Sequence, residues 1–147
     1  MAVKKGKAFE RETAAIAGKY GKVVPKSGAY GTMDGIPQMA GDVRWMLPWF
    51  DSEIHLECKH GYSDKGQERK SMRIEREWFD KHLKQAKALN FHPAFAFKFK
   101  FTHENGMSKF VCFPFSTMEK LITQMDNMYL ELEELRNEQK KRKEKTT

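Results

Sequence analysis

Two carboxylates and a lysine in the first half of the chain are spaced for metal-assisted chemistry. Glu57 and Lys59 are separated by one residue in the run EIHLECK, and Asp42 begins the run DVRWML fifteen residues upstream. Because side chains alternate along a strand, Glu57 and Lys59 project from one face, and Asp42 can lie beside them if the two strands pair. Two converging carboxylates form a hard oxygen site of the kind that Mg²⁺ accepts while it keeps several waters.

A lysine beside such a site can hold or polarise an attacking water, or balance the charge that grows on a phosphate. A bound metal would lower the pKa of the water and offset the negative charge of the phosphate. The E-x-K spacing alone is also common on exposed amphipathic strands. The combination of this spacing with Gly41-Asp42, apolar strands, a glycine-rich loop and a net basic charge favours a nuclease.

The elements that must position these residues predict a mixed α/β domain. Apolar residues at helical spacing predict three helices, at residues 7–20, 75–89 and from 116 onward. Apolar or alternating runs predict five strands and a further short one, at residues 23–24, 42–47, 53–59, 94–101, 109–115 and 71–74. Residues 25–41 and 60–70 have the composition of loops. We expect a nuclease domain over residues 1–116 and a helical tail over 117–147.

The motif G-D-V … L-E-C-K resembles that of the PD-(D/E)XK nucleases, with Gly41 where that superfamily usually has Pro. The segments KGKAFERE (5–12) and VVPKSGA (23–29) are similar to segments of the archaeal-type Holliday junction resolvase family. The resemblance covers about residues 5–100, and a phage or viral member would fit it. It implies a restriction-endonuclease-like fold, in which helices flank a mixed β-sheet and a long C-terminal helix follows.

The resemblance also implies roles for further residues. Glu10 would join Asp42 and Glu57 as a metal ligand and join both, with Lys59, as a catalytic residue; Glu12 is the competing choice. An alternative for Glu10 is a charge favoured by the helix dipole in the first turn. Ser27 matches a loop serine that would lie near the scissile phosphate, and Arg11 and Lys26 would contact the DNA backbone.

Asp34 is an alternative metal ligand, in a loop at 28–40 that is longer than in the compact archaeal members. Asp42 is preferred because a strand follows it directly. Gln85 lies where many relatives place a polar group near the active site. His55 and His60 flank the E-x-K residues, and we expect exposed side chains there.

The charge balance favours a polyanionic partner. Lys and Arg outnumber Asp and Glu by 27 to 20, which gives a formal net charge of +7. A basic stretch at 59–76 is the best candidate for contacts with the phosphate backbone, through Lys65, Arg69, Lys70, Arg73 and Arg76. The alternative is a solvated loop.

Two cysteines, Cys58 and Cys112, lie in strand-like runs without the spacing of metal ligands, which favours buried free thiols in a reducing compartment. No apolar run has the length of a membrane span, and the N-terminus lacks the apolar core of a signal peptide. We therefore expect a cytoplasmic protein without a membrane partner, in the host cytoplasm if the protein is viral.

The function expected from these features is the resolution of four-way DNA junctions by a structure-selective endonuclease. Mg²⁺ would be its cofactor, with Mn²⁺ able to substitute, and branched DNA its substrate. The alternatives are another PD-(D/E)XK nuclease (repair, restriction-like or exonuclease) and a catalytically silent nucleic-acid-binding module. The retention of Asp42, Glu57 and Lys59 argues against the silent module.

We expect a homodimer, because two-fold symmetry would present two active sites to opposed strands. An apolar stripe in the C-terminal helix has the three-and-four spacing of a coiled-coil seam: Met118, Leu121, Met125, Met128, Leu132 and Leu135. The alternative is that this helix covers its own sheet. Ser116 and Glu119 suggest a capping box at its start, and residues 140–147 are expected to fray.

Overall fold

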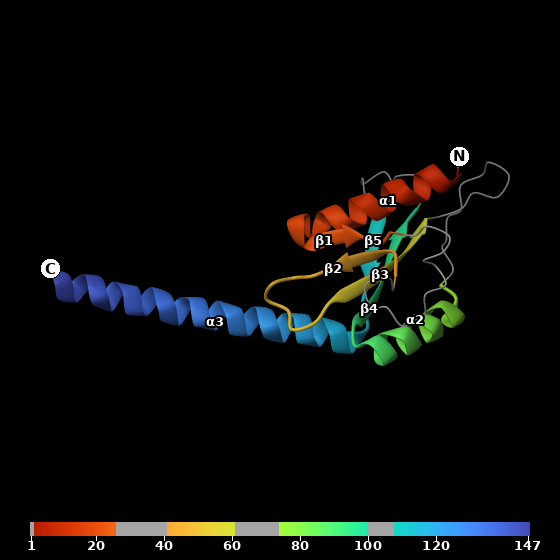
Figure 1. The fold of residues 1–147 in the computed structure, drawn as a ribbon. Helices are drawn as coiled ribbons and strands as arrows, with labels where there is room; N and C mark the ends of the chain where they lie inside the picture. The colour runs from red at the N-terminus through yellow and green to blue at the C-terminus, as the bar shows by residue number, and fades with distance from the viewer. Residues whose placement is uncertain (1, 26–40, 61–73, 100–107) are drawn as a thin grey trace. The chain divides into compact units, whose positions relative to one another are not determined.

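The computed structural model describes residues 2–25, 41–60, 74–99 and 108–147. The elements in chain order are α1 (Ala2–Ile16), the 3₁₀ turn η1 (Gly18–Tyr20), β1 (Gly21–Val23), β2 (Val43–Trp45), β3 (Ile54–His60), α2 (Arg76–Leu89), β4 (His92–Lys98), β5 (Lys109–Cys112) and α3 (Phe115–Thr146) (Figure 1). The chain divides into two compact units, Met1–Pro114 and Phe115–Thr147. The division lies close to the expected boundary at residue 116.

The first unit is built on a five-stranded sheet in the order β1-β2-β3-β4-β5. Only β3 and β4 run parallel, and α2 connects them as a crossover; the other neighbouring pairs are antiparallel. Val43 of β2 pairs with Leu56 of β3, so the strand that follows Asp42 and the strand that carries Glu57 are neighbours, as the sequence predicted. The predicted mixed sheet with flanking helices, a restriction-endonuclease-like fold, is confirmed.

Helix α1 covers one face of this sheet, and α2 lies against the other (Figure 1). On the α1 face, the indole Nε1 of Trp45 donates a 3.0 Å hydrogen bond to the carbonyl of Thr13. A Cβ atom at Gly21 would overlap the carbonyl oxygen of Ala14. Only glycine therefore allows α1 to approach the first strand this closely.

On the α2 face, aromatic rings fill the space between helix and sheet. The rings of Phe79 and Phe95 have centroids 4.4 Å apart, and His82 packs against both Phe91 and Phe95. The side chain of His82 is 1% exposed, whereas Leu83 is 43% exposed. The helical spacing of apolar residues at 75–89 predicts that Leu83 is buried; this prediction was wrong, because the neighbouring histidine occupies the inward position.

Several boundaries differ from those predicted. Helix α1 begins earlier and ends at Ile16, and β4 starts at His92, so that Pro93 is buried within the strand and pairs with His55. The left-handed conformation of Asn90, with φ 56°, ends α2 just before this strand. Ile74 is not part of a strand, and the rest of the expected short strand at 71–74 lies outside the described residues.

The second unit is a single helix of 32 residues, α3. It begins at Phe115, so Ser116 lies inside the first turn, and the capping box predicted at Ser116 was wrong by this boundary. The helix continues to Thr146 instead of fraying at 140, because Lys, Arg, Glu and Gln, which are good helix formers, dominate its end. Within the described parts of the chain, no helix is long and apolar enough to cross a membrane.

Candidate active site

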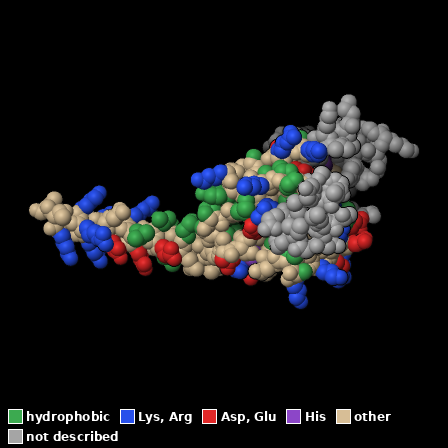
Figure 2. Space-filling view, viewed as in Figure 1, with side chains coloured by type: hydrophobic (Ala, Val, Ile, Leu, Met, Phe, Trp, Pro, Cys, Tyr) green, Lys and Arg blue, Asp and Glu red, His purple; other side chains and the backbone are tan. Residues whose placement is uncertain are grey.

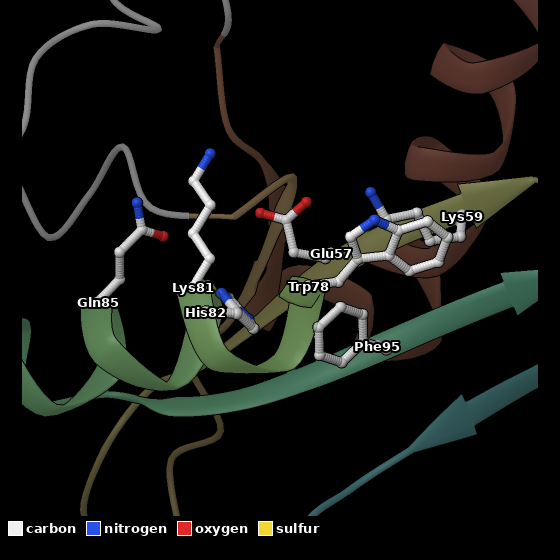
Figure 3. Close-up of a pocket in the computed structure, with 7 residues that line it drawn as sticks. All are labelled: Glu57, Lys59, Trp78, Lys81, His82, Gln85 and Phe95. Carbon is white, nitrogen blue, oxygen red and sulfur yellow. The ribbon is translucent and has the colours of Figure 1, made fainter. Parts of the chain in front are cut away.

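Strand β3 sends alternate side chains to the two helical layers. His55 stacks on Phe91 on the α2 side, with ring centroids 4.1 Å apart. Glu57 and Lys59 have the same parity and line a pocket of about 130 Å³ beside α2 (Figure 3). The full lining consists of Glu57, Lys59, Trp78, Lys81, His82, Gln85 and Phe95. The predicted common face of Glu57 and Lys59 is thus present in the structure.

Asp42 is fixed to the backbone of β3 by two hydrogen bonds. Its backbone N–H donates to the carbonyl of Leu56 at 2.8 Å, and its carboxylate Oδ2 accepts a 2.7 Å hydrogen bond from the backbone N–H of Cys58. The residue is 7% exposed and does not line the pocket. Its carboxylate nevertheless lies at the residue that separates Glu57 from Lys59.

The residue before Asp42 explains one departure from the superfamily motif. Gly41 has φ 75°, a conformation that a proline ring, locked near −65°, cannot adopt. A Cβ atom at Gly41 would also lie 3.1 Å from the carbonyl oxygen of Leu56. Glycine at position 41, where the superfamily usually has Pro, therefore lets the chain approach β3 closely as it enters β2.

The pKa of the Cys58 thiol is shifted by burial and by the charges around it. Burial raises the pKa of this thiol to about 12; a hydrogen bond with Thr13 opposes the rise, and the charges of Asp42, Glu10 and Glu57 add to it. All three predicted carboxylates thus lie close enough to this thiol for their charges to act on it. Both Cys58 and Cys112 are free and half-buried rather than fully buried.

Glu10 and Glu12 occupy different surroundings on α1. The carboxylate of Glu12 forms ion pairs with Lys98 of β4 at 3.2 Å and with Lys109 of β5 at 2.5 Å. The hydrogen bond from Lys109 is the main cause that holds the pKa of Glu12 below its ordinary value. Glu12 therefore connects α1 to β4 and β5, whereas the charge of Glu10 acts on the thiol of Cys58 in β3.

The donor chemistry of Asp42 and Glu57 fits a hard divalent cation. Mg²⁺ is commonly held by one or two carboxylates while it keeps several waters. Across residues 2–25, 41–60, 74–99 and 108–147, no group of three or more His, Cys, Asp or Glu side chains is placed to hold a metal ion. Asp42, Glu57 and Glu10 as the ligands of such a cation therefore stay a prediction.

His82 is a residue of this site that the sequence analysis missed. Its Nε2 lies 2.9 Å from the carbonyl oxygen of His55; since a carbonyl only accepts hydrogen bonds, Nε2 carries the proton and donates. Burial lowers the pKa of His82 and favours the neutral ring. This bond ties α2 to β3 two residues before Glu57. The spacing of Trp78, His82 and Gln85 on α2 was the available signal.

The other predicted residues are placed as follows. Gln85 lines the pocket, Arg11 is exposed on α1, and Arg76 begins α2 with a 3.7 Å ion pair to Asp80. The expectation of an exposed His55 was wrong, because the ring is 0% exposed and lies 2.9 Å from the Glu53 carboxylate. Half-buried His60 packs on Phe9. The remaining candidates lie outside the described residues: Lys26, Ser27, Asp34, Lys65, Arg69, Lys70 and Arg73.

An αβββαβ arrangement with an aspartate before one strand and E-x-K on the next defines the PD-(D/E)XK class of nucleases. The family model described as "Phage putative PDDEXK endonuclease" matches residues 1–147, and the chain belongs to this family. The match places the chain in a phage family of the superfamily and not in the archaeal-type resolvase family, to which its motifs are only similar. No curated protein and no solved structure matches the chain.

Proposed function

We propose that this protein is a divalent-metal-dependent DNA endonuclease that hydrolyses phosphodiesters with Asp42, Glu57 and Lys59. The observation that carries the proposal is the 2.7 Å hydrogen bond from the N–H of Cys58 to the Asp42 carboxylate. This bond brings the carboxylate of one strand to the residue between Glu57 and Lys59 on the next. The family of the chain supports the same chemistry.

Each residue has a separate task in the proposed reaction. Asp42, Glu57 and Glu10 would hold Mg²⁺, or Mn²⁺ in its place. The bound cation would make the attacking water more acidic and neutralise phosphate charge. The ammonium group of Lys59 would donate hydrogen bonds to the water or to a phosphate oxygen. The water oxygen forms a bond to phosphorus, the bond to the leaving oxygen breaks, and that oxygen takes up a proton.

A silent binding module is the poorer explanation of this site. Phosphate is negatively charged, so a surface selected only for affinity would place Lys or Arg where Asp42 and Glu57 stand. Asp42 is hydrogen-bonded to the residue that follows Glu57 in β3, and Asp42 is 7% exposed. The arrangement therefore favours catalysis.

The finer proposal is that the substrate is a four-way DNA junction. It is supported by the similarity of residues 5–12 and 23–29 to segments of the archaeal-type resolvases. The basic balance of the chain and exposed Arg11 fit contacts with a phosphate backbone. A broader activity on duplex, flap or free-ended DNA fits the family equally well.

A homodimer formed through α3 is the assembly that we propose for junction cleavage. Met118, Met125 and Leu132 recur every seven residues and are 41%, 50% and 45% exposed. A row of this spacing is self-complementary, because a second copy offers the same row. Farther along, Lys and Arg side chains gather toward the C-terminal end of the helix (Figure 2).

The test is cleavage of a junction labelled in turn on each of its four strands, beside flap and linear duplex DNA. Mg²⁺ or EDTA would be present, and Glu12→Gln would serve as the control variant. Paired cuts on two opposed strands would support junction resolution, and cuts on the other substrates would support the broader nuclease. Tight binding without a cut in any metal would contradict the proposed enzyme.

A further inference from the structure

Lys59 faces a positioning problem that Asp42 does not share. Its ammonium group sits on a flexible four-carbon chain, and holding such a chain in one conformation costs side-chain entropy. Asp42, in contrast, is held by backbone hydrogen bonds. A lysine that must meet a water or phosphate oxygen reproducibly therefore needs a neighbour that limits where its ammonium lies.

Trp78 is that neighbour in the structure. The Nζ atom of Lys59 lies 4.6 Å from the centroid of the Trp78 ring, inside the range of about 6 Å over which a ring face attracts a cation. Both side chains line the pocket that also contains Glu57 (Figure 3). The negative face of the ring thus draws the ammonium toward the side of the strand that carries Glu57.

The backbone of Trp78 is itself fixed. The residue lies in the first turn of α2, where its N–H donates a 3.1 Å hydrogen bond to the carbonyl of Glu75. One turn later, His82 anchors the same helix to the carbonyl of His55 on β3. The turn of α2 that carries Trp78 is therefore held close to β3.

A ring face suits this task better than a carboxylate would. It attracts the charge without accepting a conventional hydrogen bond, so the N–H groups of the ammonium stay available to water or phosphate. A carboxylate in its place would compete with phosphate for those donors. Indole has the strongest cation-binding face among the aromatic side chains.

We propose that Trp78 is a positioning residue that holds the ammonium of Lys59 beside Glu57 through a cation–π contact. The inference rests on the proposed function for its consequence, the rate of cleavage. The contact itself can be measured without any substrate or metal.

The first measurement is the NMR spectrum of the full chain after reductive methylation of its lysines with ¹³C. The dimethylated amine keeps its charge, and a group above a ring face is shifted upfield by the ring current. Lys19 and Lys98 also lie over rings, of Tyr20 and Phe9, so the Lys59 resonance is identified by its absence in Lys59→Arg. We expect this resonance to be shifted upfield, to stay shifted in Trp78→Phe and to return to the bulk position in Trp78→Leu. A Lys59 resonance at the bulk position in the wild-type protein would overturn the inference.

The second measurement is single-turnover cleavage. Trp78→Leu should lower the maximal rate about 5- to 30-fold with little change in DNA affinity, and Trp78→Phe should recover part of the loss. In a Lys59→Ala background, Trp78→Leu should cause no further loss. Trp49→Leu is the matched control, because Trp49 packs on Phe50 with centroids 6.1 Å apart and does not line the pocket.

The outcomes separate this inference from the proposed function. Full cleavage by Lys59→Ala would refute the role of Lys59 in the reaction, while the shifted resonance would still establish the contact. Loss of cleavage in Lys59→Ala, together with a normal rate in Trp78→Leu, would refute the positioning role alone. An equal further loss from Trp78→Leu in both backgrounds would also refute it, because the effect would then bypass Lys59.

Discussion

The carboxylate of Asp42 accepts its hydrogen bond from the backbone N–H of Cys58, at 2.7 Å. Cys58 separates Glu57 from Lys59, so this one contact joins the residue before β2 to the part of β3 that carries both side chains. An amide side chain of the same shape can still accept this bond through its oxygen, although it carries no charge. Asp42→Asn therefore separates the structural task of the residue from its proposed catalytic one.

The neighbouring acids of α1 should respond differently to loss of charge. Glu10→Gln should reduce cleavage at least about 10²-fold if Glu10 is a metal ligand as proposed, and its charge acts on Cys58, between Glu57 and Lys59. Glu12→Gln should leave cleavage within about threefold and change stability by about 1 kcal/mol or less, since its lysine pairs lie at a partly exposed position. Metal-dependent cleavage rates and urea denaturation check both expectations. Greater loss of cleavage in Glu12→Gln than in Glu10→Gln would reverse the assignment.

Gly41 should be intolerant of any side chain. Gly41→Ala combines a strained φ of 75° with a Cβ atom 3.1 Å from the Leu56 carbonyl oxygen, so we expect a loss of about 1–3 kcal/mol and weaker cleavage. Gly18→Ala is the control, because Gly18 also has positive φ, at 55°, but a Cβ atom there would meet nothing within 4 Å. The Gly18→Ala variant should lose stability without a change in its cleavage rate. Equal kinetic losses in both variants would count against a special role for the entry to β2.

The stability of the fold should fall below neutral pH partly through His82. Burial lowers the pKa of His82 from its ordinary value of 6.5. Below pH 6.5 the unfolded chain binds a proton that the folded chain excludes, so the stability from this group is present above pH 6.5 and declines as the pH falls. His82→Gln, which can still donate to the His55 carbonyl, should flatten the dependence. Urea denaturation between about pH 7.5 and 5.5 measures both slopes, and unchanged slopes would contradict a buried neutral ring.

If the dimer forms through the apolar stripe of α3, charged residues introduced into this stripe should lower the mass of the particle in solution. Met125→Glu combined with Leu132→Glu should convert the full-length protein to a monomer at micromolar concentration, because like charges would meet at the seam. Asn127→Glu, at an exposed position off the stripe, is the matched control. Sedimentation velocity distinguishes the states. A wild-type monomer under the same conditions would remove the dimer from the proposal.

The helices and strands, and the common face of Glu57 and Lys59, were predictable because both depend on local periodicity. Alternation in β3 was enough to place Glu57 and Lys59 on one face, and the apolar run after Asp42 was enough to predict a strand that pairs with it. The fold class followed from the resemblance of the same residues to a known motif.

The α2 wall of the pocket was not predictable in the same way. Periodicity does not decide between adjacent His82 and Leu83, because the choice is made by a hydrogen bond to the His55 carbonyl on another strand. The contact of Lys59 with Trp78 likewise depends on how helix and strand are placed in three dimensions. The positive φ of Gly41 was not predictable from the neighbouring residues, because glycine itself is the one local feature that allows it.

The most direct test of the central claim is the single-turnover rate of DNA cleavage by Asp42→Asn in Mg²⁺, measured with its DNA affinity and unfolding free energy. We predict a rate at least about 10²-fold below wild type, with affinity and stability close to wild type, because the hydrogen bond to Cys58 survives and only the charge is lost. A wild-type rate in the folded Asp42→Asn protein would contradict the active site assigned to Asp42, Glu57 and Lys59.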